Sequence, residues 1–226
     1  MAGIFTKAKL ALLKPDKLFE SVWGEGITQT LFYYIIIDLI FGLAIPVIAA
    51  IVILSSLYQT LVPLIFNQVI YFPIGILGLF VVAFFIHIGI RLLKGKGNYT
   101  DTYRAAVYGS TPGVVFSIFI LLPLYGFLGL LPFPASTPPQ LIDDPSFIFS
   151  LLTSIAIMAI VGILLFIWTL VLGVKGLSRF HKISGWRAFG AIVIGYVILL
   201  AIALAIVFSF LFLFVIPYMG SAVSFR

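Results

Sequence analysis

The stretch AFGAIVIGYVILLAIALAIVFSFLFLFVIPYMGSAVSF, residues 188–225, decides the fold class because it contains no charged side chain. A helix needs about 20 mostly apolar residues to cross the hydrocarbon core of a bilayer. This stretch exceeds that length, and it predicts a membrane-spanning helix over roughly Trp186–Tyr218. The surplus length favours a tilted helix or one that extends beyond the bilayer.

Charged residues upstream of this stretch delimit further apolar segments. Ile27–Ile90 carries one charge, Asp38, and is too long for a single span. The polar, proline-bearing stretch 58–68 predicts a break within it. Residues 105–142 and 145–174 carry no charge. We therefore expect an all-α fold, a polytopic membrane helix bundle of five transmembrane helices plus short interfacial helices. The four upstream spans are expected at Thr28–Leu57, Ile70–Leu93, Thr111–Leu131 and Ser146–Gly173.

The composition agrees with a chain surrounded by lipid. Charged residues make up 9% of it, against about 25% in an average soluble domain, so polar groups cannot cover its surface. Because there is no cysteine, disulfides and thiolate chemistry are excluded. The net charge of +6 is carried by residues beside apolar runs. That arrangement favours anionic lipid headgroups on the cytosolic side as partners, and not nucleic acid.

The distribution of Lys and Arg predicts the orientation. The N-terminal segment, the second-to-third loop and the fourth-to-fifth loop each hold four basic residues, whereas the other two loops hold none. Basic loops stay cytosolic, so we expect a cytosolic N-terminus and a C-terminus outside. Residues 1–27 are then a cytosolic or interfacial segment, residues 28–218 the five-span membrane domain, and residues 219–226 a short extracytosolic tail.

Two segments are typical of helices that lie along the membrane surface. In Pro15–Trp23, four apolar side chains share one helical face and the charged ones lie off it, which is typical of a helix on the cytosolic leaflet. The second segment, Thr100–Gly109, precedes Thr111 and Pro112, which suit the N-cap and first position of the third span. The apolar face of the first segment consists of Leu18, Phe19, Val22 and Trp23.

Several stretches together resemble one known family. The most extensive is GNYTDTYRAAVYGSTP at 97–112, and KPDKLFE at 14–20 and HKIS at 181–184 accompany it. The chain resembles the Yip family, five-span membrane proteins named for their interaction with Rab-type GTPases. The resemblance implies a non-enzymatic protein that organises membrane or binds partners through its cytosolic face. The motif residues are Tyr99, Thr100, Tyr103, Arg104, Tyr108 and Pro112.

The chain departs from the eukaryotic members of that family. Their cytosolic segment carries a motif of the type Asp-Leu-Tyr-Gly-Pro, which does not occur in this sequence. The chain is therefore more similar to compact bacterial or archaeal members. That similarity implies a multi-pass protein of a prokaryotic plasma membrane.

Asp38 is the candidate functional residue within the spans. A carboxylate at membrane depth is costly and usually faces a bundle interior or a cavity. It indicates either a structural hydrogen bond between helices or an ion, proton or headgroup site. Counting about 1.5 Å per residue places one polar residue of each span in the cytosolic half, with His87 the expected partner of Asp38 and Tyr196 the next. This candidate polar site is Asp38, His87, Tyr196, Ser117 and Thr169.

No motif for catalysis, nucleotide binding or metal binding accompanies these residues. The two histidines, His87 and His181, lie on different segments and lack metal-ligand spacing. We therefore expect a non-enzymatic protein without cofactor or metal. Its expected partners are membrane lipids, together with other proteins or a second copy of the chain. The alternative is a small transporter, or a lipid- or ion-handling protein, that uses Asp38 and the polar layer.

Overall fold

The computed structural model describes residues 3–52, 57–130 and 145–215, and within these ranges every regular element is a helix. Two short helices precede five long ones, in agreement with the expected class. The elements are α1 (Ile4–Leu13), α2 (Pro15–Ser21), α3 (Ile27–Val52), α4 (Leu57–Leu92), α5 (Tyr99–Leu130), α7 (Pro145–His181) and α8 (Gly185–Phe210), with a π-helical turn at Leu211–Val215.

Three of these helices contain segments long and apolar enough to cross a membrane. The segments are Phe72–Leu92, Leu152–His181 and Gly185–Leu213, found among the described residues, and Ile27–Gly42 is a shorter apolar helix. The chain is therefore a helical membrane bundle.

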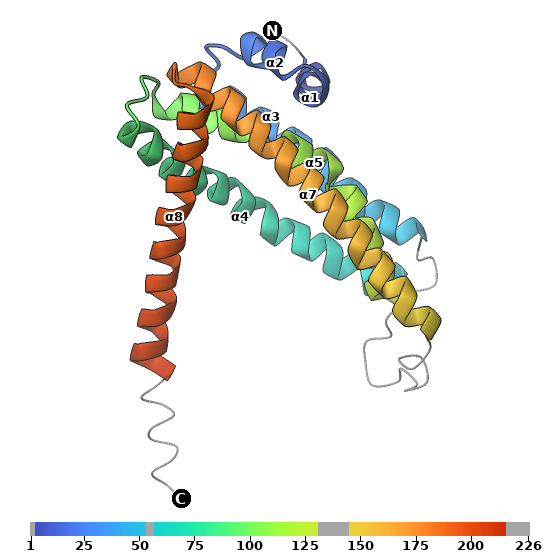
Figure 1. Cartoon of the computed structure of the whole chain (residues 1–226). Coiled ribbons are helices and arrows are strands. Elements are labelled where there is room, and N and C mark those ends of the chain that lie inside the picture. Colours follow the sequence, from blue (N-terminus) through green and yellow to red (C-terminus); the bar gives the residue numbers. More distant parts are fainter. Residues whose placement is uncertain (1–2, 53–56, 131–144, 216–226) are drawn as a thin grey trace, which may run out of the picture.

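The long helices form two groups that converge at one end (Figure 1). Helices α3, α5 and α7 pack side by side, whereas α4 begins beside them and its C-terminal half crosses the N-terminal half of α8. Helices α1 and α2 lie across the end where the α4–α5 and α7–α8 connections are found. We call this the capped end: α1, α2 and the connections 93–98 and 182–184.

Helix α5 begins earlier than the sequence predicts. Instead of a separate interfacial helix and a span from Thr111, one helix runs from Tyr99 to Leu130. Its start is stabilised by reciprocal bonds, in which the Asp101 amide donates to Asn98 Oδ1 at 3.0 Å and the Asn98 amide to Asp101 Oδ2 at 2.9 Å. Pro112 lies inside the helix, where its missing N–H removes one backbone bond; the strong cap upstream and the packed surroundings tolerate that loss.

Other helix boundaries also differ from the prediction. The expected break at 58–68 lies inside α4, and the chain leaves α3 after Val52. Proline and amide side chains are tolerated in membrane helices where neighbours satisfy the backbone, so they did not mark the turn. Helix α7 continues past Gly173 to His181, with Arg179 in its last turn, where cations are favoured by the helix dipole. The predicted tail, 219–226, lies outside the described residues.

The apolar face predicted for Pro15–Trp23 exists, but it packs on protein and not in the leaflet. Leu18, Phe19 and Val22 are fully buried, while Trp23 is 55% exposed. Phe19 meets Phe180 of α7 edge-to-face, with ring centroids 5.6 Å apart. The amphipathic pattern is the same for a lipid surface and a protein surface, so the sequence could not distinguish them. Helix α1 was not among the helices expected from the sequence.

Small residues set the helix spacing within each group. A Cβ on Gly109 of α5 would lie 3.3 Å from the Cα of Gly173 of α7. In the other group, a Cβ on Gly195 of α8 would lie 2.8 Å from the Cα of Ile86 of α4. In lipid there is no hydrophobic driving force between helices, so van der Waals packing at such close backbone contacts holds them together.

We predict that Gly195→Ala separates α8 from α4. Because the new Cβ meets backbone that cannot rotate away, the free energy of unfolding should fall by about 1–3 kcal/mol. The matched control is Gly162→Ala in α7, where a Cβ would meet nothing within 4 Å. Reversible unfolding in detergent measures the free energy of unfolding of each variant. Equal stability of the two variants would contradict the close packing.

Candidate functional site

The capped end is built around a buried ion pair between α1 and the turn before α3. Lys7 Nζ lies 2.5 Å from Glu25 Oε1, and the two side chains are 9% and 6% exposed. Tyr108 of α5 donates to the other carboxylate oxygen, Oε2, at 2.6 Å. Both oxygens of Glu25 are thus satisfied, as a buried charge requires.

Aromatic rings surround the Lys7 ammonium. It lies 6.0 Å from the ring centroid of Tyr33 and 5.8 Å from that of Tyr108, which are cation–π distances. The two tyrosine rings are 4.6 Å apart, and the Tyr33 hydroxyl lies 3.0 Å from Thr111 Oγ1. Burial, and then the bond to Glu25, raise the pKa of the Tyr108 hydroxyl. That hydroxyl therefore stays a neutral donor to the carboxylate.

Arg104 holds the same turn from the other side. Its Nη2 donates to the backbone carbonyl of Glu25, and its Nη1 donates to Asp101 Oδ1 at 3.1 Å. The guanidinium lies 5.0 Å from the Phe180 ring centroid of α7. Arg104 is 5% exposed. Arg104 therefore connects the turn before α3 with α5 and α7. Because its guanidinium is engaged in these contacts, it offers little to a ligand.

A hydroxyl bridges two histidines at the other side of the capped end. Thr102 Oγ1 lies 2.8 Å from His87 Nδ1 and 2.9 Å from His181 Nε2. The bridge joins α4, α5 and α7. Gly97 passes close to this cluster, since a Cβ there would lie 2.5 Å from His181 Nδ1. Among the described residues no group of three or more His, Asp and Glu side chains could hold a metal ion.

The remaining motif residues support the same region. Tyr99 donates to the carbonyl of Phe80 at 2.9 Å, and Tyr103 stacks on the Phe80 ring with centroids 4.4 Å apart. Pro112 is buried within α5, and Thr100 is half-buried. The two tyrosines fix α5 against α4.

This architecture has a counterpart among known families. A family model described as the Yip1 domain matches residues 9–208. The chain belongs to the Yip1 family. Comparisons with curated proteins and with solved structures give no match. The Yip1 match begins within α1 and ends within α8. It therefore includes Arg104 and Thr102 together with the residues that they contact.

In this Yip1 domain the predicted partner of Asp38 is engaged elsewhere. His87 is bonded to Thr102, and none of the described residues makes a hydrogen bond or ion pair with Asp38. Gly75 of α4 lies beside Tyr34 of α3, because a Cβ on Gly75 would lie 3.4 Å from the Tyr34 hydroxyl. This contact fixes how the antiparallel helices α3 and α4 are aligned. His87 lies roughly 18 Å further along α4, while Asp38 lies one turn of α3 away in the other direction. The expected pairing of these two side chains is therefore wrong.

The other candidate residues lie on three further helices, α5, α7 and α8. Thr169 faces α5, where its Oγ1 lies 3.9 Å from a Cβ built on Gly113, and Tyr196 is 52% exposed. Ser117 lies in α5, but its side chain is outside the described residues. The pairing of Asp38 with His87 was expected from counting along straight helices, whereas α4 crosses at an angle to α3 (Figure 1).

Sequence reasoning also missed the residues that organise the capped end. Lys7 was counted among the basic residues that face the cytosol, and Thr102 was one polar residue of an interfacial helix. Glu25 carried the one available signal. It stands between Gly24 and Gly26, directly before an apolar run, where an acidic residue has no part in the positive-inside pattern.

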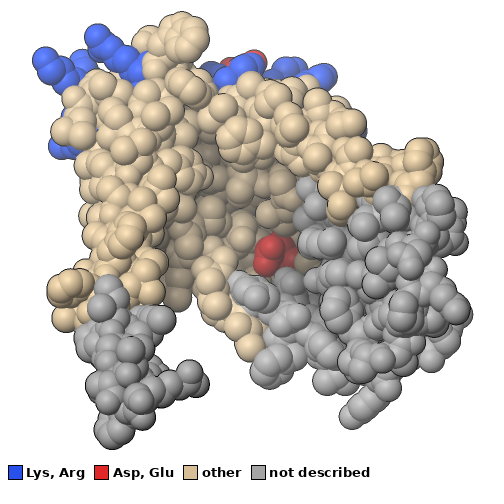
Figure 2. Space-filling model, turned by 60° about the horizontal axis from the view of Figure 1, so that its bottom comes forward, with Lys and Arg blue, Asp and Glu red and all other residues tan. Residues whose placement is uncertain are grey.

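The exposed surface of the capped end is basic. Asp16 and Glu20 of α2 pair with Lys175 at 3.0 Å and with Arg179 at 2.8 Å. The other exposed cations make no ion pair within the described residues, and Figure 2 shows Lys and Arg gathered along one edge of the molecule. We call them the basic rim: Lys9, Lys14, Lys17, Arg91, Lys94, Lys96, Lys182 and Arg187.

We predict that Lys7→Met destabilises the bundle by about 3–5 kcal/mol, because it leaves the Glu25 carboxylate buried and unpaired. The double variant Lys7→Met with Glu25→Gln should recover part of that loss, since no lone charge remains. SDS titration of the purified proteins measures the free energy of unfolding of the wild type, the single variant and the double variant. As a control, Lys175→Met breaks an exposed pair and should cost at most about 1 kcal/mol. A loss of that small size for Lys7→Met would contradict a structural role of the buried pair.

Proposed function

We propose that this Yip1-family chain is a non-enzymatic, five-span membrane protein. In this proposal the capped end faces the cytosol, and the protein organises the membrane or binds partners through that face. The five long helices, the alternating positive charge of the loops and the family match support it. A cytosolic capped end also agrees with the positive-inside rule.

The observation that carries the proposal is the contrast between buried and exposed charge at the capped end. The buried charges Lys7, Glu25 and Arg104 have structural partners. The basic rim makes no ion pair with the described residues, so its charge is available to an external group. Each Lys or Arg held near an anionic membrane surface contributes about 1 kcal/mol of attraction. Anionic phospholipid headgroups are therefore the partners that we expect first.

The rim is fixed in place by the helix ends. Lys94 and Lys182 have positive φ values of 62° and 53°, and each reverses the chain directly after a helix, α4 or α7. The amide of Gly95 closes the first turn onto the carbonyl of Ile90 at 2.9 Å, a helix C-terminal motif. Because both turns are ordered by backbone bonds, their lysines form a preorganised surface.

The transporter alternative draws less support. It needs the polar residues of the spans to face one another, and Asp38, His87 and Tyr196 do not. Figure 2 shows acidic side-chain atoms inside a hollow of the bundle. A single carboxylate without a described partner does not define a transport route.

The orientation can be tested by cysteine labelling, because the chain has no native cysteine. In intact cells, Lys96→Cys should be protected from a membrane-impermeant maleimide and should react after permeabilisation. Ser136→Cys, between α5 and α7, should react in intact cells. The reverse pattern would place the capped end outside and remove the basis of the proposal.

The lipid preference can be tested by removing rim charge. Lys96→Gln with Lys182→Gln should lower the phosphatidylglycerol retained by the purified protein, with about fivefold weaker binding per lysine. The matched control, Lys175→Gln with Arg179→Gln, removes the same charge from residues already paired with Asp16 and Glu20. Native mass spectrometry of protein from nanodiscs counts the bound lipids. An equal loss in both variants would mean that net charge, and not the rim, attracts the lipid.

A further inference from the structure

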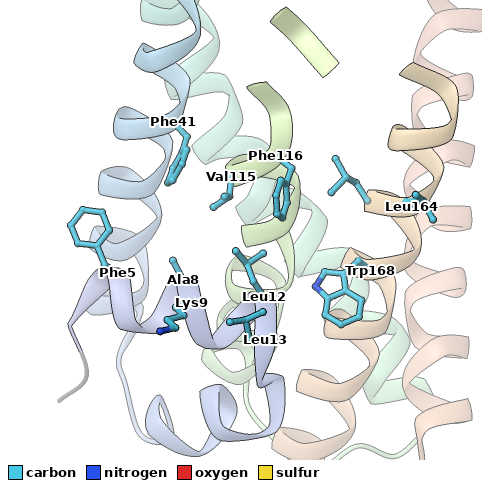
Figure 3. A pocket seen from close by; sticks show the side chains of 11 residues that line it. Phe5, Ala8, Lys9, Leu12, Leu13, Phe41, Val115, Phe116, Leu164 and Trp168 are labelled. Atoms are coloured by element: carbon cyan, nitrogen blue, oxygen red, sulfur yellow. The ribbon is translucent and has the colours of Figure 1, made fainter. Parts of the chain in front are cut away.

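An apolar groove of about 630 Å³ lies between α1 and three of the long helices. Figure 3 shows its lining, with Phe41 from α3, Phe116 from α5 and Trp168 from α7 around side chains of α1. All of its eleven lining residues are apolar except Lys9. A groove of this chemistry suits a hydrocarbon occupant, because it offers a single polar group.

The position of α1 places this groove at the boundary between headgroups and acyl chains. Phe5 and Leu13, at the two ends of α1, are each 67% exposed. Exposed apolar side chains on a helix that also carries exposed lysine are typical of a helix lying in the membrane interface. The Trp168 indole, also partly exposed, is of the type enriched at that depth.

The groove is fixed by the interior of the capped end. Ala8 lines it and is buried, and the neighbouring Lys7 is held by Glu25. That pair and the tyrosine rings beside it anchor α1 against α3 and α5, so the fold itself holds this wall of the groove in place. A preformed apolar groove avoids the ordering cost of binding.

Lys9 is the one charged residue among those that line the groove. It is exposed, lines the groove, and makes no ion pair with any described residue. A lipid whose chain lies in the groove has its phosphate near that ammonium, and a headgroup with net negative charge gains an attraction that a zwitterionic one does not.

We propose that this groove binds one acyl chain of an anionic phospholipid of the cytosolic leaflet, with Lys9 contacting its phosphate. The inference rests on the proposed function for the orientation of the bundle. It goes beyond that function in assigning a defined site, distinct from the diffuse attraction of the rest of the basic rim.

Trp168 provides the probe. The chain has three tryptophans, and Trp23→Phe with Trp186→Phe leaves Trp168 as the single fluorophore. The protein is reconstituted in phosphatidylcholine vesicles that contain, at equal mole fraction, either brominated phosphatidylglycerol or brominated phosphatidylcholine. Bromine on the acyl chain quenches a tryptophan that it touches, so we expect quenching with an apparent affinity about fivefold higher for the anionic lipid.

Two matched pairs of variants identify the site. Lys9→Gln should abolish the preference for the brominated anionic lipid, whereas Lys17→Gln, on α2 and outside the groove, should keep it. Leu164→Phe narrows the groove and should weaken quenching, whereas Ile163→Phe, equally exposed on α7 but not a lining residue, should not.

Three results would overturn the inference. They are equal quenching by the two lipids, a preference that survives Lys9→Gln, and shielding of Trp168 from both lipids, which would mean that a second copy or another protein covers the groove. Failure of the proposed function gives a different result. In that case Lys96→Gln with Lys182→Gln leaves total lipid retention unchanged, while the quenching at Trp168 still depends on Lys9.

Discussion

The buried ion pair between Lys7 and Glu25 is the contact on which the capped end depends. Two charges taken out of water are tolerated only when their geometry is good and their remaining hydrogen-bonding capacity is used. Here Tyr108 uses the second carboxylate oxygen, and two aromatic rings flank the ammonium. The requirement to satisfy one carboxylate therefore determines where α1 lies, how the chain enters α3, and which face of α5 is turned inward.

The rest of the fold follows from a division of tasks between polar and small residues. Polar contacts are concentrated at the capped end, where they specify which helices meet. Along the spans, glycines at Gly109, Gly173 and Gly195 let backbones approach closely, which is how helices associate without a hydrophobic driving force between them. Membership of the Yip1 family agrees with this division, since the motif residues Tyr103 and Arg104 lie in the polar part.

The sequence was sufficient for the helical membrane class and for most of the apolar segments, because hydropathy over about 20 residues is a strong signal. It was insufficient for register. Asp38 and His87 were placed in the same half of the membrane by counting along straight helices, and the crossing of α4 separates them. It was also insufficient for Lys7, because a lysine buried against Glu25 and a lysine facing the cytosol have the same sequence pattern. The continuous α5 was missed because Pro112 was interpreted as a helix start, and the Asn98–Asp101 cap upstream was not recognised.

The bridge at Thr102 has a consequence for the proton positions of two residues that are far apart in the sequence, His87 and His181. A threonine hydroxyl has one hydrogen to donate, while both His87 Nδ1 and His181 Nε2 lie within bonding distance of it. The hydroxyl cannot donate to both rings, so at least one of these two nitrogens must carry its own hydrogen. The tautomers of the two histidines are therefore not independent. A change of tautomer in one ring restricts the choice of the other, across a contact that joins α4 to the end of α7.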